Sequence, residues 1–279
     1  MNRVYLSRLT TIGPNGMGLI ASGIQSWQEL SAATASSQHS TCSESLGCER
    51  PQVAADEISS GPGRGEEMPK LKASWFFKEP FIKFGRMDRF TQLVLAISRC
   101  CLNEAPIDGM VLGSAWGSIH QDQIHCANVV HKVQTSPAIF TYTLPSVALG
   151  ELSILHQHHG ENIMVEAAET SGLQALYEGY WMVRSGRVKQ CLIIAADYID
   201  AHRARAWACL LNAEAGDLEI LRAQSYREAT SSQGPVGLGD AGFDTIARSL
   251  CHRISGEHHL KEASSQGHIL EFCWIFHGE

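Results

Sequence analysis

The stretch Ile163-Met-Val-Glu-Ala-Ala-Glu-Thr-Ser-Gly172 combines an apolar run with a short polar turn that closes on glycine. The run predicts a buried strand, and the residues that follow keep helical spacing to about Arg184. Ser185-Gly186-Arg187 then ends the helix, and the apolar run 191–196 predicts a second strand. A strand, a helix and a second strand in this order indicate an α/β domain with a mixed sheet layered between helices.

Upstream of this unit, apolar runs typical of strands and apolar residues at helical spacing both recur. From Asp88 the apolar residues recur at helical spacing, and the side chain of Asp88 is placed to cap that helix. The run 109–114 is bounded by glycines and predicts a buried strand, whereas 118–132 and 144–158 predict helices. Residues 3–12 alternate loosely and predict an edge or surface strand.

The remaining segments predict less. A short helix is expected around Gly23 to Leu30, and 31–70 is rich in Ser, Gly, Pro and Glu, which is typical of a mobile insertion. In the tail, 243–254 fits an amphipathic helix and 268–276 fits a strand. The domain organisation expected is therefore a core of 1–30 and 71–200, a low-complexity insertion at 31–70, and a divergent C-terminal extension of the same domain at 201–279.

Composition excludes several classes of function. The 279 residues are 44% hydrophobic and carry a net charge of −7, with no basic stripe that would neutralise nucleic-acid phosphates. No apolar run reaches the length of a membrane helix, and the start of the chain lacks a signal-peptide core. The nine cysteines suggest neither a disulfide framework nor a paired Cys-x-x-Cys zinc site. These features predict a cytoplasmic protein with no nucleic-acid or membrane partner.

Five segments, in order, resemble the N-terminal domain of the β-ketoacyl-acyl-carrier-protein synthases of the thiolase-like superfamily. They are Arg86-Met-Asp-Arg-Phe-Thr-Gln-Leu, Val111-Leu-Gly-Ser-Ala-Trp-Gly, Ser136-Pro137 with Gly150, Glu166-Ala-Ala-Glu-Thr-Ser-Gly-Leu-Gln-Ala-Leu, and Ser185-Gly-Arg with Ile193-Ile-Ala-Ala-Asp. Together they cover about 86–198. The resemblance implies the N-terminal half of the thiolase-like fold.

Two departures from the family bear on function. The position of the family's nucleophilic cysteine falls on Glu169, and a carboxylate forms no thioester with an acyl chain. The family's later His-x-Thr-x-Thr and Gly-His-x-x-Gly-Ala-Ala-Gly motifs are also missing, since the only Gly-His pair, Gly267-His268, continues with Ile-Leu-Glu. No catalytic residue is therefore expected. The chain resembles the shortened, cysteine-less chain-length-factor-type partners of ketosynthases in fatty acid, polyketide or aryl-polyene synthesis.

The resemblance also implies partners. A complete ketosynthase would form a heterodimer with this chain, and an acyl carrier protein would dock on the complex; no cofactor or metal is implied. The segment expected to face the partner's acyl pocket is Ala138, Ile139, Phe140 and Thr141. The strand expected to pair across the dimer axis is Gln190, Cys191, Leu192, Ile193, Ile194, Ala195 and Ala196.

Other readings of the same residues stay open. Glu169 is either a helix-capping or partner-facing carboxylate or the general base of a retooled acyltransferase or decarboxylase. A degenerate reading frame would account for the Ser-rich insertion and the unusual tail. The histidines at 156, 158 and 159 and the pair at 258–259 do not predict a metal, because a site needs three or four convergent ligands. Ser171 is expected to bond a free amide in the first helical turn.

Overall fold

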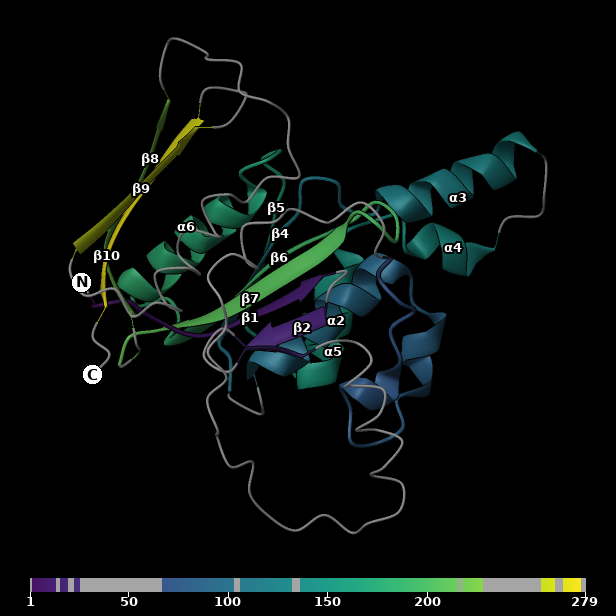
Figure 1. Ribbon diagram of the computed structural model, residues 1–279, viewed down its shortest axis with the longest axis horizontal. Coiled ribbons are helices and arrows are strands. Elements are labelled where there is room, and N and C mark those ends of the chain that lie inside the picture. The colour runs from purple at the N-terminus through teal and green to yellow at the C-terminus, as the bar shows by residue number, and fades with distance from the viewer. Residues whose placement is uncertain are drawn as a thin grey trace.

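The chain forms one mixed β-sheet flanked by helices (Figure 1). The computed structural model describes residues 2–13, 16–19, 23–25, 67–102, 106–131, 136–214, 216, 218–227, 257–263 and 268–276. The main strand order is β5-β4-β6-β7-β1-β8-β10-β9, with β2 beside β1 and β3 beside β2. Their bounds are β1 Tyr5–Gly13, β2 Gly16–Leu19, β3 Gly23–Gln25, β4 Gly109–Gly113, β5 Glu161–Val165, β6 Gln190–Tyr198, β7 Ala204–Asn212, β8 Leu218–Arg227, β9 Glu257–Ala263 and β10 His268–Phe276.

The parallel part of the sheet consists of β4 with β5 on one side and β6 on the other. The remaining pairings are antiparallel, beginning with β6 against β7. β5 and β6 are not neighbours, so the chain passes over β4 through the helix α6, Ser171–Arg184. This is the predicted strand, helix, strand unit, and the predicted α/β fold class is confirmed.

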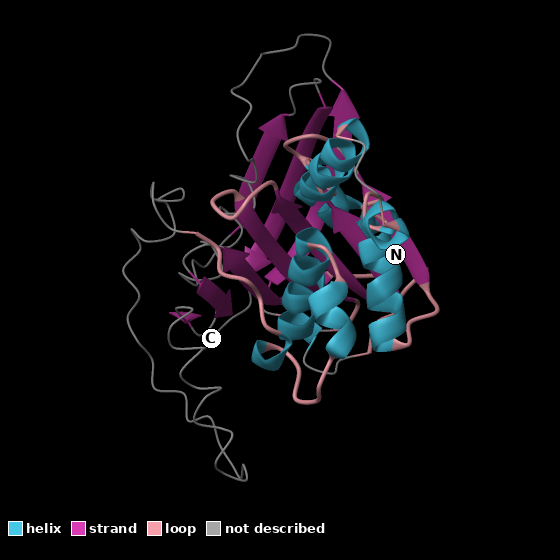
Figure 2. Ribbon diagram, turned by 90° about the vertical axis from the view of Figure 1, so that its right-hand side faces the viewer, coloured by secondary structure: helices cyan, strands magenta, loops and turns pink. Residues whose placement is uncertain are grey.

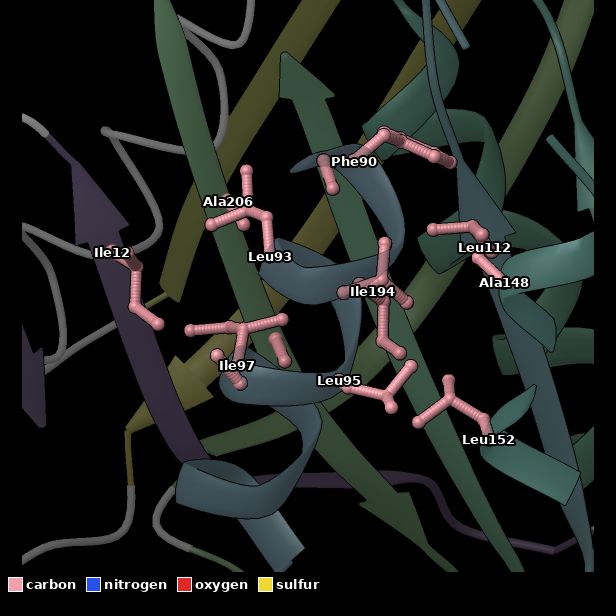
Figure 3. Close-up of a cluster of buried hydrophobic side chains, with 14 of the residues drawn as sticks. Ile12, Phe90, Leu93, Leu95, Ile97, Leu112, Ala148, Leu152, Ile194 and Ala206 are labelled. Atoms are coloured by element: carbon pink, nitrogen blue, oxygen red, sulfur yellow. The ribbon is translucent and has the colours of Figure 1, made fainter. Parts of the chain in front are cut away.

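Helices cover both faces of the sheet (Figure 2). On one face lie α2, Arg89–Leu102, and α5, Val147–His156, and on the other lies α6. Alternate residues of β6 serve the two layers, Ile194 facing α2 and Ile193 facing α6. Figure 3 shows the first layer, in which Leu93, Ile97 and Leu152 surround Ile194. Each such fully buried side chain contributes about 1.5 to 3 kcal/mol relative to exposure.

Two sets of hydrogen bonds fix the start of α2. The carboxylate of Asp88 accepts hydrogen bonds from the backbone amides of Phe90 and Thr91, both at 3.1 Å. These amides would otherwise lack partners in the first turn. The side-chain amide of Gln92 donates hydrogen bonds to the Phe84 and Met87 carbonyls. These bonds tie α2 to the preceding 3₁₀ helix Ile82–Arg86. A shorter 3₁₀ helix covers Ala73–Trp75. The predicted cap at Asp88 is confirmed.

The strand β1 changes face partway along its length. Its register with β7 slips by one residue between Ser7 and Thr10, and Arg8 has a φ of 54°. This β-bulge places Leu6 in the layer of α6 but Ile12 in the layer of α2, although an unbroken strand would put both on one side. The prediction of an edge or surface strand is wrong, because β1 lies between β7 and β8 and alternates between two buried layers.

A pair of helices projects from the body of the protein, away from β8 to β10 (Figure 1). These are α3, Ile119–Val130, and α4, Pro137–Thr141, which pack on each other. We refer to α3 and α4 as the helical arm. The helix predicted at 118–132 is confirmed, whereas α4 falls in a segment for which no element was predicted.

Other predictions have mixed outcomes. Gly23–Gln25 is a strand and not the start of a helix, because it pairs with β2. Residues 31–66 and the helix predicted at 243–254 lie outside the described residues. At the end of the predicted insertion, Met68 is buried and its amide bonds the Ala201 carbonyl at 2.6 Å. The strand predicted at 268–276 is confirmed as β10, and β8 joins it to the main sheet through β1. Within the described residues, no helix is both long and apolar enough to cross a membrane.

Candidate functional site

The carboxyl ends of the three parallel strands meet at one edge of the sheet. There β4 runs into the turn 114–117 and β5 runs into the elbow 166–170. Asp197, near the end of β6, lies beside the first of these turns. The Ser114 amide donates to the Val165 carbonyl at 3.0 Å and so joins the first two segments. In sheets of this kind, the carboxyl ends of the strands are where functional loops gather. We therefore take this edge as the candidate site.

The elbow is a tight turn that Ser171 holds closed. Ala168 has a φ of 48°, in the left-handed region that side chains other than glycine rarely adopt. The Ser171 hydroxyl accepts from the Ala167 amide at 2.8 Å and donates to the Ala168 carbonyl at 2.6 Å. Ser171 binds a backbone amide, but that amide belongs to Ala167 in the elbow and not to the first helical turn as predicted, and the strained residue was not predicted.

Glu169 follows the strained residue and precedes α6. Its side chain is half-buried, and the next residue, Thr170, is buried and bonds the Ala167 carbonyl at 2.9 Å. Glu169 thus stands on a turn whose backbone is fixed on both sides. The N-terminus of α6 lies next to it in the chain.

Asp197 organises the neighbouring turn and was missed in the sequence. Its Oδ1 accepts three hydrogen bonds, from the Ser114 hydroxyl at 2.8 Å and from the amides of Ala115 at 2.9 Å and Trp116 at 3.0 Å. Burial raises the pKa of this carboxyl above its usual range, and the hydrogen bonds oppose that shift. Successive amides of this kind form an anion-binding nest, and here the chain's own carboxylate fills it.

Close backbone approach at the site depends on two glycines. A Cβ on Gly113 would lie 2.3 Å from the Ser171 carbonyl oxygen, so only glycine lets α6 begin this close to β4. Gly117 has a φ of 50°, and a Cβ there would lie 2.6 Å from Pro145. Gly113 was predicted only as a boundary of the strand, and the steric need for glycine at either position was not predicted.

The predicted pocket-lining segment lies on the helical arm. Ala138 and Thr141 are exposed on α4, while the Ile139 carbonyl accepts a bond from Gln121 of α3 at 3.4 Å. The Phe140 ring is 59% exposed and lies 5.5 Å from the His125 ring. The structure thus places these four residues against α3 and toward solvent. Their role at a partner's acyl pocket stays a prediction.

The predicted dimer strand, 190–196, occupies an interior position. Along this whole stretch β6 pairs with β7, and from Cys191 to Ala195 it also pairs with β4. It has no free edge with which to pair across a dimer axis, so that assignment is wrong. Among the described strands the sheet ends at β5 on one side and at β9 on the other.

The histidine-rich segment lies at the opposite end of the parallel strands. His156, His158 and His159 line a hollow of about 620 Å³ with the residues that precede β4. Burial, with the nearby charges of Arg99 and His158, lowers the pKa of His156 to about 4. The ring nitrogen Nδ1 of His158 lies within hydrogen-bond distance of the Ile107 carbonyl oxygen, at 3.2 Å. This hollow is remote from the elbow and does not contribute to the candidate site.

The description of the chain as cysteine-less is wrong, since it contains nine cysteines. The cysteines in the described residues form no disulfide, and Cys191 and Cys209 are buried within the sheet. Burial raises the pKa of the Cys101 thiol to about 12, which leaves it protonated and unreactive at neutral pH. That Glu169 occupies the position of the family's nucleophile stays a prediction.

Solved structures with the same fold include ketosynthases. One is described as a ketosynthase in complex with its chain length factor from Xenorhabdus doucetiae, with a TM-score of 0.60, 16% identity, and coverage of 99% of this chain and 100% of that chain. Another is the ishigamide ketosynthase/chain length factor, with a TM-score of 0.68, 14% identity and the same coverage. A third is a β-ketoacyl synthase from Burkholderia phymatum, with a TM-score of 0.61, 12% identity and again the same coverage.

Sequence comparison gives the family directly. No curated protein matches the sequence. The model of the β-ketoacyl synthase N-terminal domain, however, matches residues 16–212, which takes in the sheet edge, the elbow and the helical arm. Since that match covers more than half of the chain, the protein belongs to the β-ketoacyl synthase family through its N-terminal domain.

Proposed function

We propose that this chain is a non-catalytic, chain-length-factor-type subunit that acts with a complete β-ketoacyl synthase during acyl-chain elongation. The proposal is supported by Glu169 on the fixed elbow between β5 and α6, at the position to which the predicted motif match assigns the family's nucleophilic cysteine. A carboxylate there accepts no acyl group from a carrier as a thioester. The partner would supply the cysteine and receive the acyl carrier protein.

An exposed apolar surface on the helical arm supports a protein partner. On α3, Val129 is 54% and Val130 is 73% exposed, and near α4, Phe140 is 59% and Leu144 is 57% exposed. Exposed apolar side chains that gather on and beside one projecting pair of helices favour an interaction site. The matched ketosynthase/chain length factor structures are complexes of this kind.

The open edge of β5 supplies a second element of the proposed interface. Among the described strands, Glu161–Val165 pairs only with β4, so its outer edge is available to extend the sheet. We propose β5, in place of β6, as the strand that meets the partner. This choice follows from the position of β5 at the end of the strand order.

Co-expression with a complete β-ketoacyl synthase from the same organism tests the proposal. We expect a stable heterodimer by size-exclusion chromatography with light scattering, and condensation activity that requires the partner's cysteine. The paired variant Val130→Asp/Phe140→Asp should abolish the heterodimer, whereas Ile154→Asp, an exposed apolar position on α5, should leave it intact. A monodisperse monomer beside the partner would contradict the proposal.

A second experiment separates this function from chemistry at Glu169. Malonyl-carrier protein incubated with the heterodimer should release carbon dioxide at the same rate with the Glu169→Ala variant as with the wild type. Loss of that release would instead assign a general-base role to Glu169 and overturn the non-catalytic reading.

The proposed influence on chain length has its own readout. If Ile139 and Phe140 limit the acyl pocket by their volume, the Ile139→Ala/Phe140→Ala variant should give longer products. Val130→Ala, on α3 of the same arm, is the matched control and should leave product length unchanged. Products of unchanged length from an intact heterodimer would contradict this role.

A further inference from the structure

The outer face of the last two strands gathers three metal-binding side chains. In the antiparallel pair of β9 and β10, His259 stands opposite Cys273 and Glu257 stands opposite Ile275. Side chains alternate along each strand, so Leu260, Phe272 and Trp274 face the core shared with α6. Glu257, His259 and Cys273 accordingly lie together on the other face.

The donor atoms of the three residues converge. The Cys273 thiol donates to Glu257 Oε1 at 2.8 Å, and His259 Nε2 lies 3.4 Å from the same oxygen. All three donor atoms lie within 4.8 Å of one another. Zinc takes nitrogen, oxygen and sulfur ligands at about 2.0 to 2.3 Å, which puts the ligand atoms of a tetrahedral site about 3.3 to 3.8 Å apart. Movements of about 1 Å would bring these atoms to that geometry.

Burial and charge around the cluster suit a bound cation. Cys273 is 4% exposed within the sheet, whereas Glu257 and His259 are exposed, so solvent reaches the cluster from one side. Lys261, the next residue of β9 on this face, is ion-paired with Glu271 at 3.8 Å. Arg222 of β8 pairs with Cys273 of β10 and, like Lys261, carries a positive charge near the cluster. A thiolate and a carboxylate together would balance the two charges of a divalent ion.

We propose that Glu257, His259 and Cys273 form a Zn²⁺ site with three protein ligands and one position open to water or another ligand. Zinc binding replaces the hydrogen bond between Cys273 and Glu257, and the thiol proton passes to solvent as the sulfur–zinc bond forms. A thiolate and an imidazole select zinc over magnesium or calcium, which prefer oxygen ligands. The sequence predicted no metal here. His259 and Cys273 are apart in the sequence, and only the pairing of β9 with β10 brings them together.

The site is independent of the proposed partner function. It lies on β9 and β10, beyond the residues 16–212 that the family model matches, and on the far side of the molecule from the helical arm (Figure 1). Failure of one proposal therefore leaves the other untouched.

Metal content and cobalt absorption of the full chain test the site. After removal of metal with a chelator and dialysis against zinc, the wild type should retain stoichiometric zinc by elemental analysis. Cobalt in its place should give a thiolate charge-transfer band in the near ultraviolet. Cys273→Ser should abolish that band, and Cys273→Ser and His259→Ala should each weaken zinc binding at least about 100-fold by calorimetry.

Two controls keep the result interpretable. Cys126→Ser removes an exposed free cysteine on α3 and should leave the zinc content and the cobalt band unchanged. His259→Ala alters an exposed strand position, so it reports on binding even if Cys273→Ser fails to fold. If the wild type retains no more zinc than the His259→Ala variant, or if Cys126→Ser removes the cobalt band, the hydrogen-bonded cluster holds no metal and the proposal is overturned.

Discussion

At the scale of single residues, the candidate site depends on groups that satisfy backbone atoms. Asp197 accepts from Ser114, Ala115 and Trp116 through one oxygen, and Ser171 clasps the elbow through its hydroxyl. Neither side chain has to react for the site to keep its shape. The Asp197 acceptor and the strained backbone of the elbow can each be tested by substitution.

Asp197→Ala should lower the free energy of unfolding by about 2 to 3 kcal/mol, because it leaves a hydroxyl and two amides without their acceptor. Asp197→Asn keeps an acceptor oxygen and removes a buried charge, so its effect should stay within about 1 kcal/mol. Urea unfolding of the two variants checks this difference. Equal losses would mean that the negative charge, and not the acceptor, holds the turn.

The strained elbow gives a prediction of opposite sign. Ala168→Gly should raise the free energy of unfolding by about 0.5 to 1 kcal/mol, because glycine adopts a positive φ without steric cost. Ala127→Gly, at an exposed position within α3, should lower it by about 1 kcal/mol. Thermal unfolding of the pair measures both, and a loss of stability in Ala168→Gly would contradict the strain.

At the scale of elements, close contact between β4 and α6 positions the elbow. Gly113→Ala should destabilise the protein by more than about 3 kcal/mol, because the added carbon meets backbone atoms of Ser171 that cannot move away without shifting α6. Gly150→Ala, inside α5 with open space around it, should instead stabilise by about 0.5 to 1 kcal/mol. Chemical unfolding of both variants provides the comparison.

The end of α5 makes stability depend on pH. His156 has a pKa of about 4 in the folded protein and an ordinary value near 6.5 when unfolded, so the unfolded chain binds the extra proton as pH falls from about 6.5 toward 4. Stability should therefore fall over that window and stay level with respect to this group above about pH 7.5. After allowance for partial exposure, His156→Gln should remove about 1 to 2 kcal/mol of the loss between pH 7.5 and 4.5. Identical pH profiles for the two proteins would contradict this.

Elements whose signals are local could be predicted from the sequence. The helix after Asp88, the strand at 109 and the unit around the elbow all carry an apolar period and a capping or turn residue. The face change in β1 could not be predicted, because it depends on a bulge at Arg8 formed against β7, about 200 residues later in the chain. A separation of 83 residues between Ser114 and Asp197 likewise hid the acceptor role of Asp197, which requires the register of β6 with β4.

At the scale of the whole molecule, the outer strands complete the core. Trp274 on β10 is 1% exposed and packs in the same layer as α6, although its indole nitrogen has no hydrogen-bond partner among the described residues. The layer beside α6 therefore draws on both the region matched by the family model and the strands that follow it. Folding of the two parts should be cooperative.

Trp274→Ala tests that cooperativity. It should cost about 3 to 5 kcal/mol through the cavity it leaves, and unfolding followed by fluorescence and by circular dichroism should still coincide. Trp274→Phe should cost less, since it keeps most of the volume and removes the unpaired nitrogen. Separate transitions for the two probes would show that β8 to β10 unfold independently of the rest.

The place of β1 in the sheet also sets an order of events during synthesis. Tyr5 pairs with Asn212, so the first strand of the chain can pair with β2 early but acquires its neighbour β7 only after some 200 further residues have been made. At ribosomal rates of about 5 to 20 residues per second, this wait lasts about 10 to 40 s. Such long-range pairing also slows folding through loop-closure entropy. During that interval the apolar side chains of β1 remain exposed, and they are the natural target for a chaperone that meets the nascent chain.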